Sequence, residues 1–373
     1  MKLLFWLSFG IIFYTYAVYP VLVYLLSLVF KRRVKKSDIY PKVSILISAY
    51  NEEKFIEAKI KSILELDYPQ DKIEVLIGSD GSNDNTDEIV SRFLNDRTNL
   101  FRFQLREGKP SVLNSLAEQA KNEILVFTDA RQRLDKNSLK ELVANFSDDK
   151  VGSVSAELLF SDADKDNAQG ISLYWQYEKF IRLSESNVGS MLGATGAMYA
   201  VRKELFTSLP KNLILDDVYI PLKSVEKGFR AIFEPRAIIF DSISRDAGEE
   251  FKRKARTLSG NFQIFILLRK LFNPFISPVA VQLFSHKFLR LTVPFFLICL
   301  FVSNVFVLEE GILRAIFIAQ VIFYILALLG LFTDMLKNIT NVPKMFLVMN
   351  AAAVVGLYRF LFKKQNVAWQ KTA

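Results

Sequence analysis

Side chains able to do chemistry follow three separate apolar runs in the first third of this 373-residue sequence. The residues directly after these runs are Tyr50-Asn51-Glu52, Asp80 and Asp129. Carboxylates in such positions can hold a hard metal ion or accept a proton from a substrate. Arg131 stands two residues after Asp129, where a second carboxylate would be expected if Asp129 held a metal.

The three apolar runs are predicted to be buried strands of one sheet. Strand-like segments alternate with segments of helical spacing, which predicts parallel strands joined by crossover helices, the α/β architecture. The expected strands are 43–49, 73–79, 101–104 and 124–128, and the expected helices are 52–66, 85–94 and 111–120. Ligands bind beyond the carboxyl ends of parallel strands. The residues after the first, second and fourth strands are therefore expected to lie on one rim.

Helix capping is the alternative interpretation of these carboxylates, because Asp and Asn favour caps and turns. This alternative suits Asp84 and Asn85, which precede a predicted helix, better than Asp80 and Asp129, which directly end buried strands. A further pair, Asp216-Asp217, precedes a predicted helix at 218–227 and is open to the same alternative.

The composition indicates a membrane protein, because 51% of the residues are hydrophobic and 33 are Phe. The stretch 3–30 is long enough to cross a bilayer, which needs roughly 20 residues. It runs into the basic block 31–36, so we expect an uncleaved anchor and not a signal peptide. Further candidate spans are 289–308, 312–332 and 345–362. The last one carries Asn350 and Arg359, and is either a span packed in a bundle or an interfacial helix.

The basic block predicts that the following domain lies in the cytoplasm, at the plasma (inner) membrane. The predicted parts are a transmembrane anchor with its basic flank at 1–36, a cytoplasmic domain at 40–250, an amphipathic interfacial segment at 251–284, and a membrane region of two or three spans at 285–373. A third C-terminal span would leave Lys363 and Lys364 outside, against the charge rule.

The charge and the rare residue types restrict the possible partners. One Cys and one His exclude an intrachain disulfide and a zinc site with the usual nitrogen and sulfur ligands. The net charge of +9 suits anionic lipid headgroups and a phosphate-bearing substrate. Nucleic acid is not an expected partner, because the basic residues are not interleaved with an aromatic reader motif.

Seven motifs, in order, resemble those of family 2 glycosyltransferases with a GT-A nucleotide-sugar domain. They are Ser48-Ala49-Tyr50-Asn51-Glu52, Asp80-Gly81-Ser82 with Asp84 and Thr86, Arg106-Glu107-Gly108-Lys109, Thr128-Asp129-Ala130, Gly193-Ala194-Thr195-Gly196-Ala197, Leu215-Asp216-Asp217 and Arg253-Lys254-Ala255-Arg256-Thr257. They cover about residues 40–265, and the flanking spans look like those of the membrane-embedded members. The resemblance implies a GT-A, Rossmann-like fold with a mainly parallel sheet.

The resemblance also implies a role for each matched residue. The nucleotide-binding residues would be Ala49, Tyr50 and Glu52 for the base and ribose, Asp80 for the uracil edge, Lys109 near the phosphates, Asp129 for ribose and metal, and Arg131 beside the diphosphate. Asp217 matches the general base. The acceptor and diphosphate group would comprise Gly193, Gly196, Asp216 at the Glu position of the family's Glu-Asp pair, and Arg253 and Arg256 at the ends of the family's Q-x-x-R-W motif.

The reaction implied by this resemblance is transfer of a sugar from a nucleotide donor, expected to be a UDP-sugar. The acceptor would be lipid-linked or saccharide, in cell-surface polysaccharide or glycolipid synthesis. A single base acting from the far side of the anomeric carbon inverts that centre. Processive synthesis with translocation is one alternative, and a non-catalytic nucleotide-sugar sensor or scaffold is another.

Two motifs depart from the family pattern. Arg131 cannot ligate a metal, so either Asp129 holds Mg²⁺ or Mn²⁺ with waters and diphosphate oxygens, or Arg131 partly replaces the metal, or the chain binds nucleotide without turnover. Arg253 replaces Gln and Thr257 replaces Trp in the last motif, which weakens the processive alternative. Arg253 and Arg256 could also form the basic face of a helix on the membrane surface.

Overall fold

The computed structural model describes residues 1–160, 169–241, 247–333 and 336–362. The chain forms two compact units. We call the first the helical unit, whose described residues are 1–29, 169–184, 247–333 and 336–362, and the second the sheet unit, whose described residues are 30–160 and 185–241. The stretch 40–250, expected to be one domain, is thus interrupted by a segment that groups with the membrane helices.

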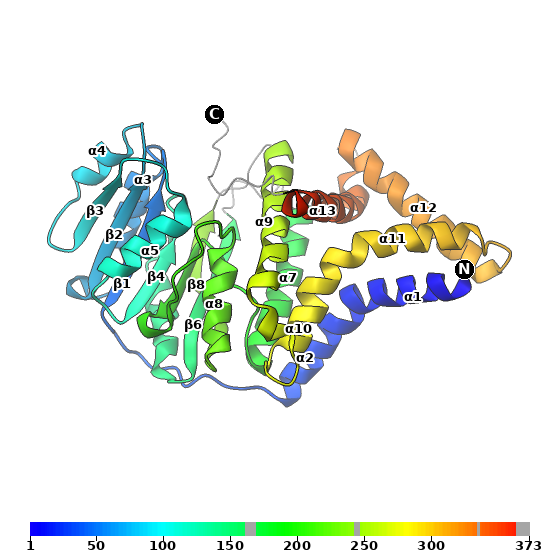
Figure 1. Ribbon diagram of the computed structural model, residues 1–373, viewed down its shortest axis with the longest axis horizontal. Helices are drawn as coiled ribbons and strands as arrows, with labels where there is room; N and C mark the ends of the chain where they lie inside the picture. The colour runs from blue at the N-terminus through cyan, green and yellow to red at the C-terminus, as the bar shows by residue number, and fades with distance from the viewer. Residues whose placement is uncertain (161–168, 242–246, 334–335, 363–373) are drawn as a thin grey trace. The chain divides into compact units, whose positions relative to one another are not determined.

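The sheet unit is built on eight strands in the order β3-β2-β1-β4-β7-β6-β8-β5 (Figure 1). The strands are β1 (Val43–Ala49), β2 (Ile73–Asp80), β3 (Thr98–Phe103), β4 (Ile124–Thr128), β5 (Arg133–Leu134), β6 (Val151–Phe160), β7 (Met198–Arg202) and β8 (Arg230–Asp241). The first four strands pair in parallel, as the sequence predicts, whereas β7 runs antiparallel to both β4 and β6. The sheet is therefore mixed.

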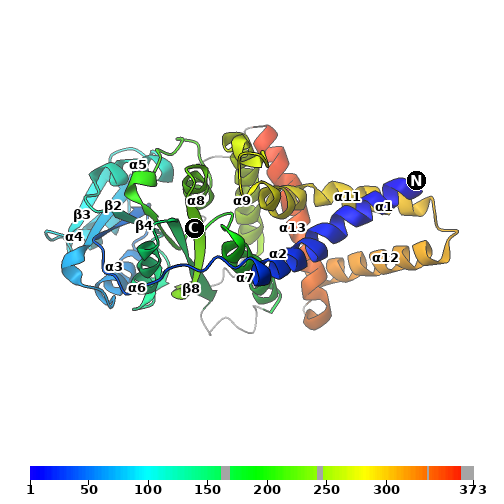
Figure 2. The ribbon, with the colours of Figure 1, turned by 90° about the horizontal axis from the view of Figure 1, so that it is seen from below.

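Helices cover both faces of this sheet. In Figure 2, α3 (Ile56–Leu64) and α6 (Ser138–Val143) lie on one face, and α5 (Lys109–Gln119) and α8 (Asp216–Glu226) lie on the other. Strands β1 and β4 are buried along almost their whole length for this reason, which explains why they read as continuous apolar runs. The short helix α4 (Thr86–Ser91) follows β2.

The predicted helix 52–66 is shorter in the structure, because residues before Ile56 form a turn. The backbone amides of Glu52 and Glu53 donate to Thr86 Oγ1 and Asp84 Oδ2, at 2.7 and 3.2 Å. Asp84 Oδ1 also accepts from the amide of Thr86 at 3.0 Å, which is an Asx turn. The N-cap of α4 is Asn85, which makes no side-chain capping hydrogen bond. The loops after β1 and β2 are thereby tied together.

The strand order reverses direction beside β1. The chain passes from β1 outward to β2 and β3, and then returns to place β4 on the other side of β1. A crevice outside the carboxyl ends of the strands forms at such a switch point, and it is the usual place for a ligand in open α/β sheets. The candidate residues after β1, β2 and β4 all lie at this edge.

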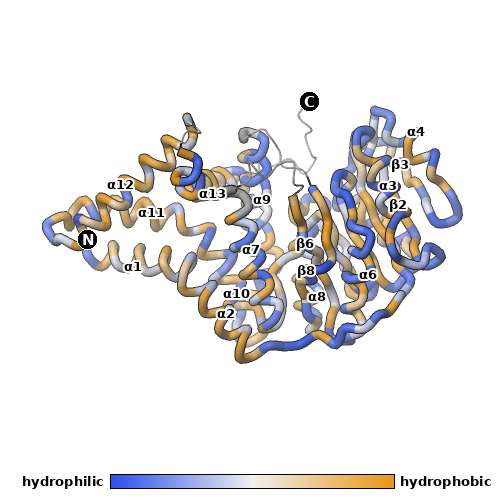
Figure 3. Tube along the Cα trace, turned by 180° about the vertical axis from the view of Figure 1, so that it is seen from behind, coloured by the Kyte–Doolittle hydropathy of each residue, from blue (hydrophilic) through white to orange (hydrophobic). Residues whose placement is uncertain are grey.

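The helical unit contains four helices that are long and apolar enough to cross a membrane, judged by length and composition among the described residues. They are Lys2–Val29, Ala280–Val305, Gly311–Phe332 and Lys337–Leu361. Figure 3 shows that they are hydrophobic along most of their length. The component elements are α1 (Lys2–Phe13), η1 (Tyr14–Val18), α2 (Tyr19–Val29), α10 (Ala280–Gln282), η7 (Leu283–Phe288), α11 (Leu289–Val305), α12 (Gly311–Phe332) and α13 (Lys337–Leu361).

Two further helices, α7 (Gln169–Val188) and α9 (Ala247–Leu267), pack within the helical unit, α7 with its residues up to Ser184. Glu178 of α7 is buried, and its carboxylate forms an ion pair with Arg290 of α11 and a hydrogen bond with His286 Nε2 of η7 at 3.3 Å. The Tyr177 hydroxyl donates to the backbone carbonyl of Tyr16 in η1 at 2.9 Å. Polar contacts therefore join α7 to two of the candidate spans.

Candidate active site

Tyr50, Asp80 and Asp129 lie at the carboxyl ends of three neighbouring parallel strands. Ala49, the buried last residue of β1, pairs with Ser79 of β2, so Tyr50 and Asp80 leave the sheet at the same level. Asp129 follows the end of β4 on the other side of β1. The structure therefore brings these three residues to one rim, as their positions in the sequence predict.

Asp80 holds the loop that leads into α5. Its Oδ1 accepts hydrogen bonds from the backbone amides of Glu107 at 2.7 Å and Gly108 at 3.2 Å, and its Oδ2 accepts from Gly108 at 3.0 Å. Gly108 has a φ of 90°, a left-handed conformation that favours glycine. Asp80 thus has a local structural role, and a carboxylate has lone pairs left for a ligand as well.

The ring of Tyr50 is covered by an arginine of the loop that leads into α5. The guanidinium carbon of Arg106 lies 3.8 Å from the centre of the Tyr50 ring, which is a close cation–π contact. The motif Arg106-Glu107-Gly108-Lys109 therefore reaches both the residue expected to embrace the base and, through Lys109, the carboxylates beyond β4.

Lys109 joins two of the candidate carboxylates. Its Nζ lies 2.9 Å from Asp129 Oδ1 and 3.2 Å from Asp216 Oδ1. Burial alone would lower the pKa of the Lys109 ammonium, but the charges of Asp129, Asp216 and Asp217 outweigh burial and raise it. Lys109 is therefore a permanent cation at the centre of an acidic cluster.

Asp216 is held from its other side by a tyrosine that the sequence did not single out. The hydroxyl of Tyr199, in the middle of β7, donates to Asp216 Oδ2 at 2.7 Å, and both side chains are buried. Burial and the charge of Asp216 raise the pKa of the Tyr199 phenol well above its ordinary value. Tyr199 is thus a fixed donor, and Asp216 is engaged on both oxygens. Neither member of the Asp216-Asp217 pair is the N-cap of α8, which is Leu215.

Asp129 and Asp217 face each other across Gly196. A Cβ added to Gly196 would lie 3.5 Å from Asp129 Oδ2 and 3.5 Å from Asp217 Oδ2. The two carboxylate oxygens are therefore no more than about 7 Å apart. Gly193, in the same motif, has a different role, because a Cβ there would meet Val218 Cγ2 of α8 at 3.0 Å. Gly196 leaves room between the carboxylates, and Gly193 allows close packing.

Arg131 pairs with Glu52 of the loop after β1. Its Nε lies 3.3 Å from both carboxylate oxygens of Glu52, and its guanidinium carbon lies 5.6 Å from the centre of the Phe55 ring. Two residues that were expected to contact the nucleotide are therefore partners of each other. Arg131 belongs to the same rim and carries a positive charge there.

Few side chains at this site could ligate a metal ion. Within the described ranges, no group of three or more His, Cys, Asp or Glu side chains could hold a metal ion. The side chain of Asp129 is 39% exposed, and Asp217 lies across Gly196 from it. This arrangement does not suit a closed protein-only site. It fits a divalent ion that takes one or two protein carboxylates and completes its shell with phosphate oxygens and water.

A buried lysine, Lys59, lies behind Asp129, and the sequence pattern does not reveal it. Lys59, on the inner face of α3, is 1% exposed, and its Nζ donates to Thr128 Oγ1 at 2.7 Å and to the carbonyl of Gln132 at 2.9 Å. Thr128 Oγ1 in turn donates to the carbonyl of Ala197 at 2.6 Å. Lys59 thus ties both ends of the turn that carries Asp129 and Arg131 to the loop that contains Gly196.

Burial lowers the pKa of Lys59 to about 7, although the charges of Asp129 and Asp241 act in the opposite direction. The only signal in the sequence was a lysine at an apolar position of an amphipathic helix, four residues before Ile63. Periodicity alone does not separate such a residue from an exposed lysine.

Arg253 and Arg256 lie on α9, in the helical unit. Arg253 is exposed on this helix and pairs with Glu250 at 2.6 Å. The expectation that the two arginines lie beside the acceptor and the diphosphate stays a prediction.

Comparison with known proteins finds a likeness to glycosyltransferases. Residues 44–209 match the family model described as glycosyl transferase family 2. The "Probable glycosyltransferase YdaM" of Bacillus subtilis is 23% identical over 372 residues, which cover 89% of this chain and 86% of that protein. The poly-beta-1,6-N-acetyl-D-glucosamine synthase of Staphylococcus aureus is 25% identical over 239 residues, and the match spans 57% of its length.

Among solved structures, the mannosyltransferase PcManGT from Pyrobaculum calidifontis, in complex with GDP-Man and Mn²⁺, has a similar fold. Its TM-score is 0.74 at 22% sequence identity, and the match covers 98% of each chain. The expected GT-A, Rossmann-like fold with additional helices long enough to cross a membrane is confirmed by this likeness and by the family match.

Proposed function

We propose, from the match of residues 44–209 to the family 2 glycosyltransferase model, that this chain is a membrane-bound, inverting transferase. It moves a sugar from a nucleotide donor, a UDP-sugar in this proposal, to a lipid-linked or saccharide acceptor at the cytoplasmic face. One observation carries the proposal: Asp129 Oδ2 and Asp217 Oδ2 both lie 3.5 Å from the position that a Cβ at Gly196 would take, and Lys109 links Asp129 to Asp216 beside them.

The two adjacent aspartates have different roles in this proposal. Asp216 is buried between Tyr199 and Lys109, so its oxygens are committed to fixed donors. Asp217 is directed toward Gly196 and is the general base. It takes the proton of the acceptor hydroxyl as the oxygen bonds to the anomeric carbon, and the bond from that carbon to the diphosphate breaks. One displacement from the face opposite the diphosphate inverts the anomeric centre.

Cationic side chains would offset the charge on the leaving diphosphate. Lys109 suits this role because its ammonium stays charged and lies at the edge of the space between the carboxylates. Arg131 is a second candidate, provided that the diphosphate replaces Glu52 as its partner. Mg²⁺ or Mn²⁺, held by Asp129, would neutralise the diphosphate further. The Mn²⁺ and GDP-Man bound to the mannosyltransferase of similar fold support a metal and a sugar nucleotide here.

Processive synthesis is the second candidate function. It is favoured by the staphylococcal relatives, whose name describes a polymer synthase. The altered residues Arg253 and Thr257 in the last motif favour addition of a single sugar instead. The length of the product separates the two, because a single transfer gives one product and a processive enzyme gives a ladder.

The substitution Asp217→Asn tests the proposed base. It keeps the size of the side chain but removes the proton acceptor, so release of nucleoside diphosphate should fall by about 10²–10⁴-fold while donor binding is retained. Purified protein in detergent would be incubated with UDP- and GDP-sugars, with Mg²⁺, Mn²⁺ or a chelator, and both release and binding would be measured.

Asp149→Asn is the matched control, because Asp149 is an exposed carboxylate of the same unit, and it should leave turnover unchanged. Normal turnover by Asp217→Asn would show that another group is the base. Binding of nucleotide without release of diphosphate by the unaltered protein, across all donors, would instead support the sensor alternative.

A further inference from the structure

Helix α13 is one of the four candidate membrane spans, but its surroundings differ from those of the other three. By length and composition Lys337–Leu361 could cross a bilayer. The basic residues Lys363 and Lys364 follow it in the sequence. If α13 crossed, these lysines would lie on the side opposite to the basic block 31–36, which the positive-inside rule disfavours.

The direction of α13 within the helical unit is the first observation. Figure 2 shows α1, α11 and α12 running alongside one another, whereas α13 runs crosswise to them next to α9. Phe5 of α1 packs with Leu300 of α11 and Leu313 of α12 in one apolar cluster, as expected for helices that cross together. A helix that lies crosswise to a bundle of spans lies along the membrane surface.

The packing of α13 against α9 is the second observation. A Cβ added to Gly356 would lie 3.0 Å from the amide nitrogen of Ser259 and 3.1 Å from the carbonyl oxygen of Ala255, so the two helix backbones almost touch. The rings of Phe262 and Phe360 stack at 5.9 Å. The close contact places the C-terminal half of α13 at the level of α9.

Helix α9 cannot lie in the hydrocarbon core. Its N-terminal half carries acidic and basic residues in close succession, Glu249, Glu250, Lys252, Arg253 and Lys254, and such charges are costly in a bilayer. α9 also follows the sheet unit in the sequence and precedes the span that begins at Ala280. It therefore lies on the membrane side that carries the sheet unit.

The N-terminal end of α13 is on that same side. The spans Ala280–Val305 and Gly311–Phe332 are joined by a short connection, so the second one returns the chain to the side from which the first began. A Cβ added to Gly330, near the end of α12, would lie 2.9 Å from Thr340 Cβ in the second turn of α13. Both ends of α13 are thus at one face of the membrane.

We propose that α13 is an interfacial helix, which lies along the membrane surface on the side that carries the sheet unit and does not cross. In this proposal the other three candidate helices cross the bilayer. This inference concerns the membrane topology of the chain, and it does not depend on the proposed reaction.

Cysteine labelling tests the position of α13. The chain has one cysteine, Cys299, so Cys299→Ser gives a background for single-cysteine variants. The variants Phe362→Cys, Asp149→Cys in the sheet unit and Glu309→Cys between α11 and α12 would be treated with a membrane-impermeant maleimide in sealed vesicles of both orientations. Phe362→Cys should label in the same vesicles as Asp149→Cys. Labelling together with Glu309→Cys would overturn the proposal.

A depth measurement decides the case in which position 362 does not react. Nitroxide spin labels would be placed at positions 339, 354 and 361. The depth of each label in the membrane would be measured from its accessibility to oxygen and to a water-soluble nickel complex. Similar, shallow depths at all three positions support an interfacial helix, and a passage through the bilayer centre overturns it.

Discussion

Asp216 and Asp217 show how two identical neighbours acquire different chemistry. Successive residues of a helix point about 100° apart, so in the first turn of α8 they meet different surroundings. Asp216 meets the Tyr199 hydroxyl and the Lys109 ammonium inside the sheet unit, and Asp217 Oδ2 lies near Gly196. The fold therefore gives the two carboxylates different surroundings, and the proposed division into a positioning carboxylate and a base rests on this difference.

Lys59 gives the clearest residue-scale prediction. The variant Lys59→Met keeps the length of the side chain but leaves Thr128 Oγ1 and the Gln132 carbonyl without their donor. Because these groups hold the turn that carries Asp129, nucleotide binding should weaken by about tenfold, the equivalent of one lost hydrogen bond in a buried site. Titration of purified protein with nucleotide measures the change.

Lys59→Arg, which retains a hydrogen-bond donor, is the control and should bind nucleotide better than Lys59→Met. Equal binding by the two variants would contradict the positioning role.

The stability of the protein should also depend on pH through Lys59. Its pKa is about 7 in the fold and 10.5 in the ordinary state, so between these values the unfolded chain binds the additional proton. Stability therefore rises with pH from about 7 to 10.5, and below about 7 both states are protonated, so Lys59 causes no further change. Thermal melting from pH 6 to pH 10 should show this rise in the wild type and a flatter profile in Lys59→Met.

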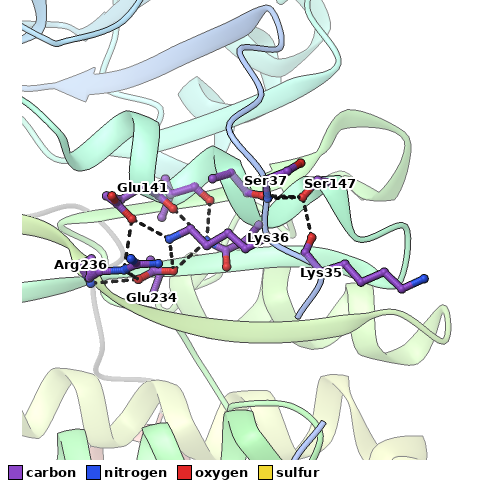
Figure 4. Close-up of polar contacts among 10 residues, drawn as sticks. Lys35, Lys36, Ser37, Glu141, Ser147, Glu234 and Arg236 are labelled. Carbon is purple, nitrogen blue, oxygen red and sulfur yellow. Dashed lines mark hydrogen bonds and ion pairs between the residues drawn. The ribbon is translucent and has the colours of Figure 1, made fainter. Parts of the chain in front are cut away.

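At the scale of elements, the basic block 31–36 is an extended segment attached to the surface of the sheet unit, and we call it the strap. Its residues alternate, as in an extended chain, between Val34 and Lys36, which face inward, and Arg33 and Lys35, which are exposed. Figure 4 shows Lys36 between two carboxylates, with its Nζ 2.6 Å from Glu141 and 2.7 Å from Glu234. The exposed members keep the charge that orients a membrane protein, and the inward members attach the segment.

Lys36→Met tests the strap. Glu234 is 8% exposed, so removal of its cation should lower the free energy of unfolding of the sheet unit by about 2 kcal/mol at neutral pH. Burial alone would raise the pKa of Glu234, but the hydrogen bond and charge of Lys36 lower it below 4.5. This stabilisation is present above 4.5 and is lost as pH falls through the lowered value, so the two proteins should converge in acid.

Lys35→Met is the control for this experiment, since Lys35 contributes only backbone hydrogen bonds to the strap and its side chain points away from Glu141 and Glu234 (Figure 4). Melting measured from pH 3 to pH 8 would reveal the difference. Equal destabilisation by both variants would mean that the extended backbone, and not the ion pair, holds the strap.

At the scale of the whole molecule, the two units have separate cores and should respond separately to mutation. Glu178 is buried in the helical unit against Arg290 and His286. Glu178→Ala leaves a buried guanidinium without its anion, which should destabilise the helical unit by about 3 kcal/mol. Nucleotide affinity, a property of the sheet unit, should be unchanged. Calorimetry in detergent, with and without nucleotide, distinguishes the two effects.

Gln176→Ala, an exposed change on the same helix, is the control for Glu178→Ala. A loss of nucleotide affinity in Glu178→Ala that matches its loss of stability would show that the donor site depends on the helical unit.

The sequence by itself determined the parallel part of the sheet, the rim residues Tyr50, Asp80 and Asp129, and the membrane character of the two ends. These features follow from local patterns, because the apolar period predicts each strand and the topology of parallel strands brings their ends together. The antiparallel β7, which makes the sheet mixed, has no such pattern in its short apolar run.

Only the tertiary structure decided which charges meet. The partnerships of Lys109 with Asp216, of Lys59 with Thr128, and of Arg131 with Glu52 each join residues at least 69 positions apart. Local pattern carries no information about such pairs, since a lysine at an inner position and one at an outer position of a helix look alike until the partner is in place. The course of α13 was undecided for the same reason: its length and composition allow a span, and only the tertiary structure shows its close packing against α9 and α12, on which the interfacial proposal rests.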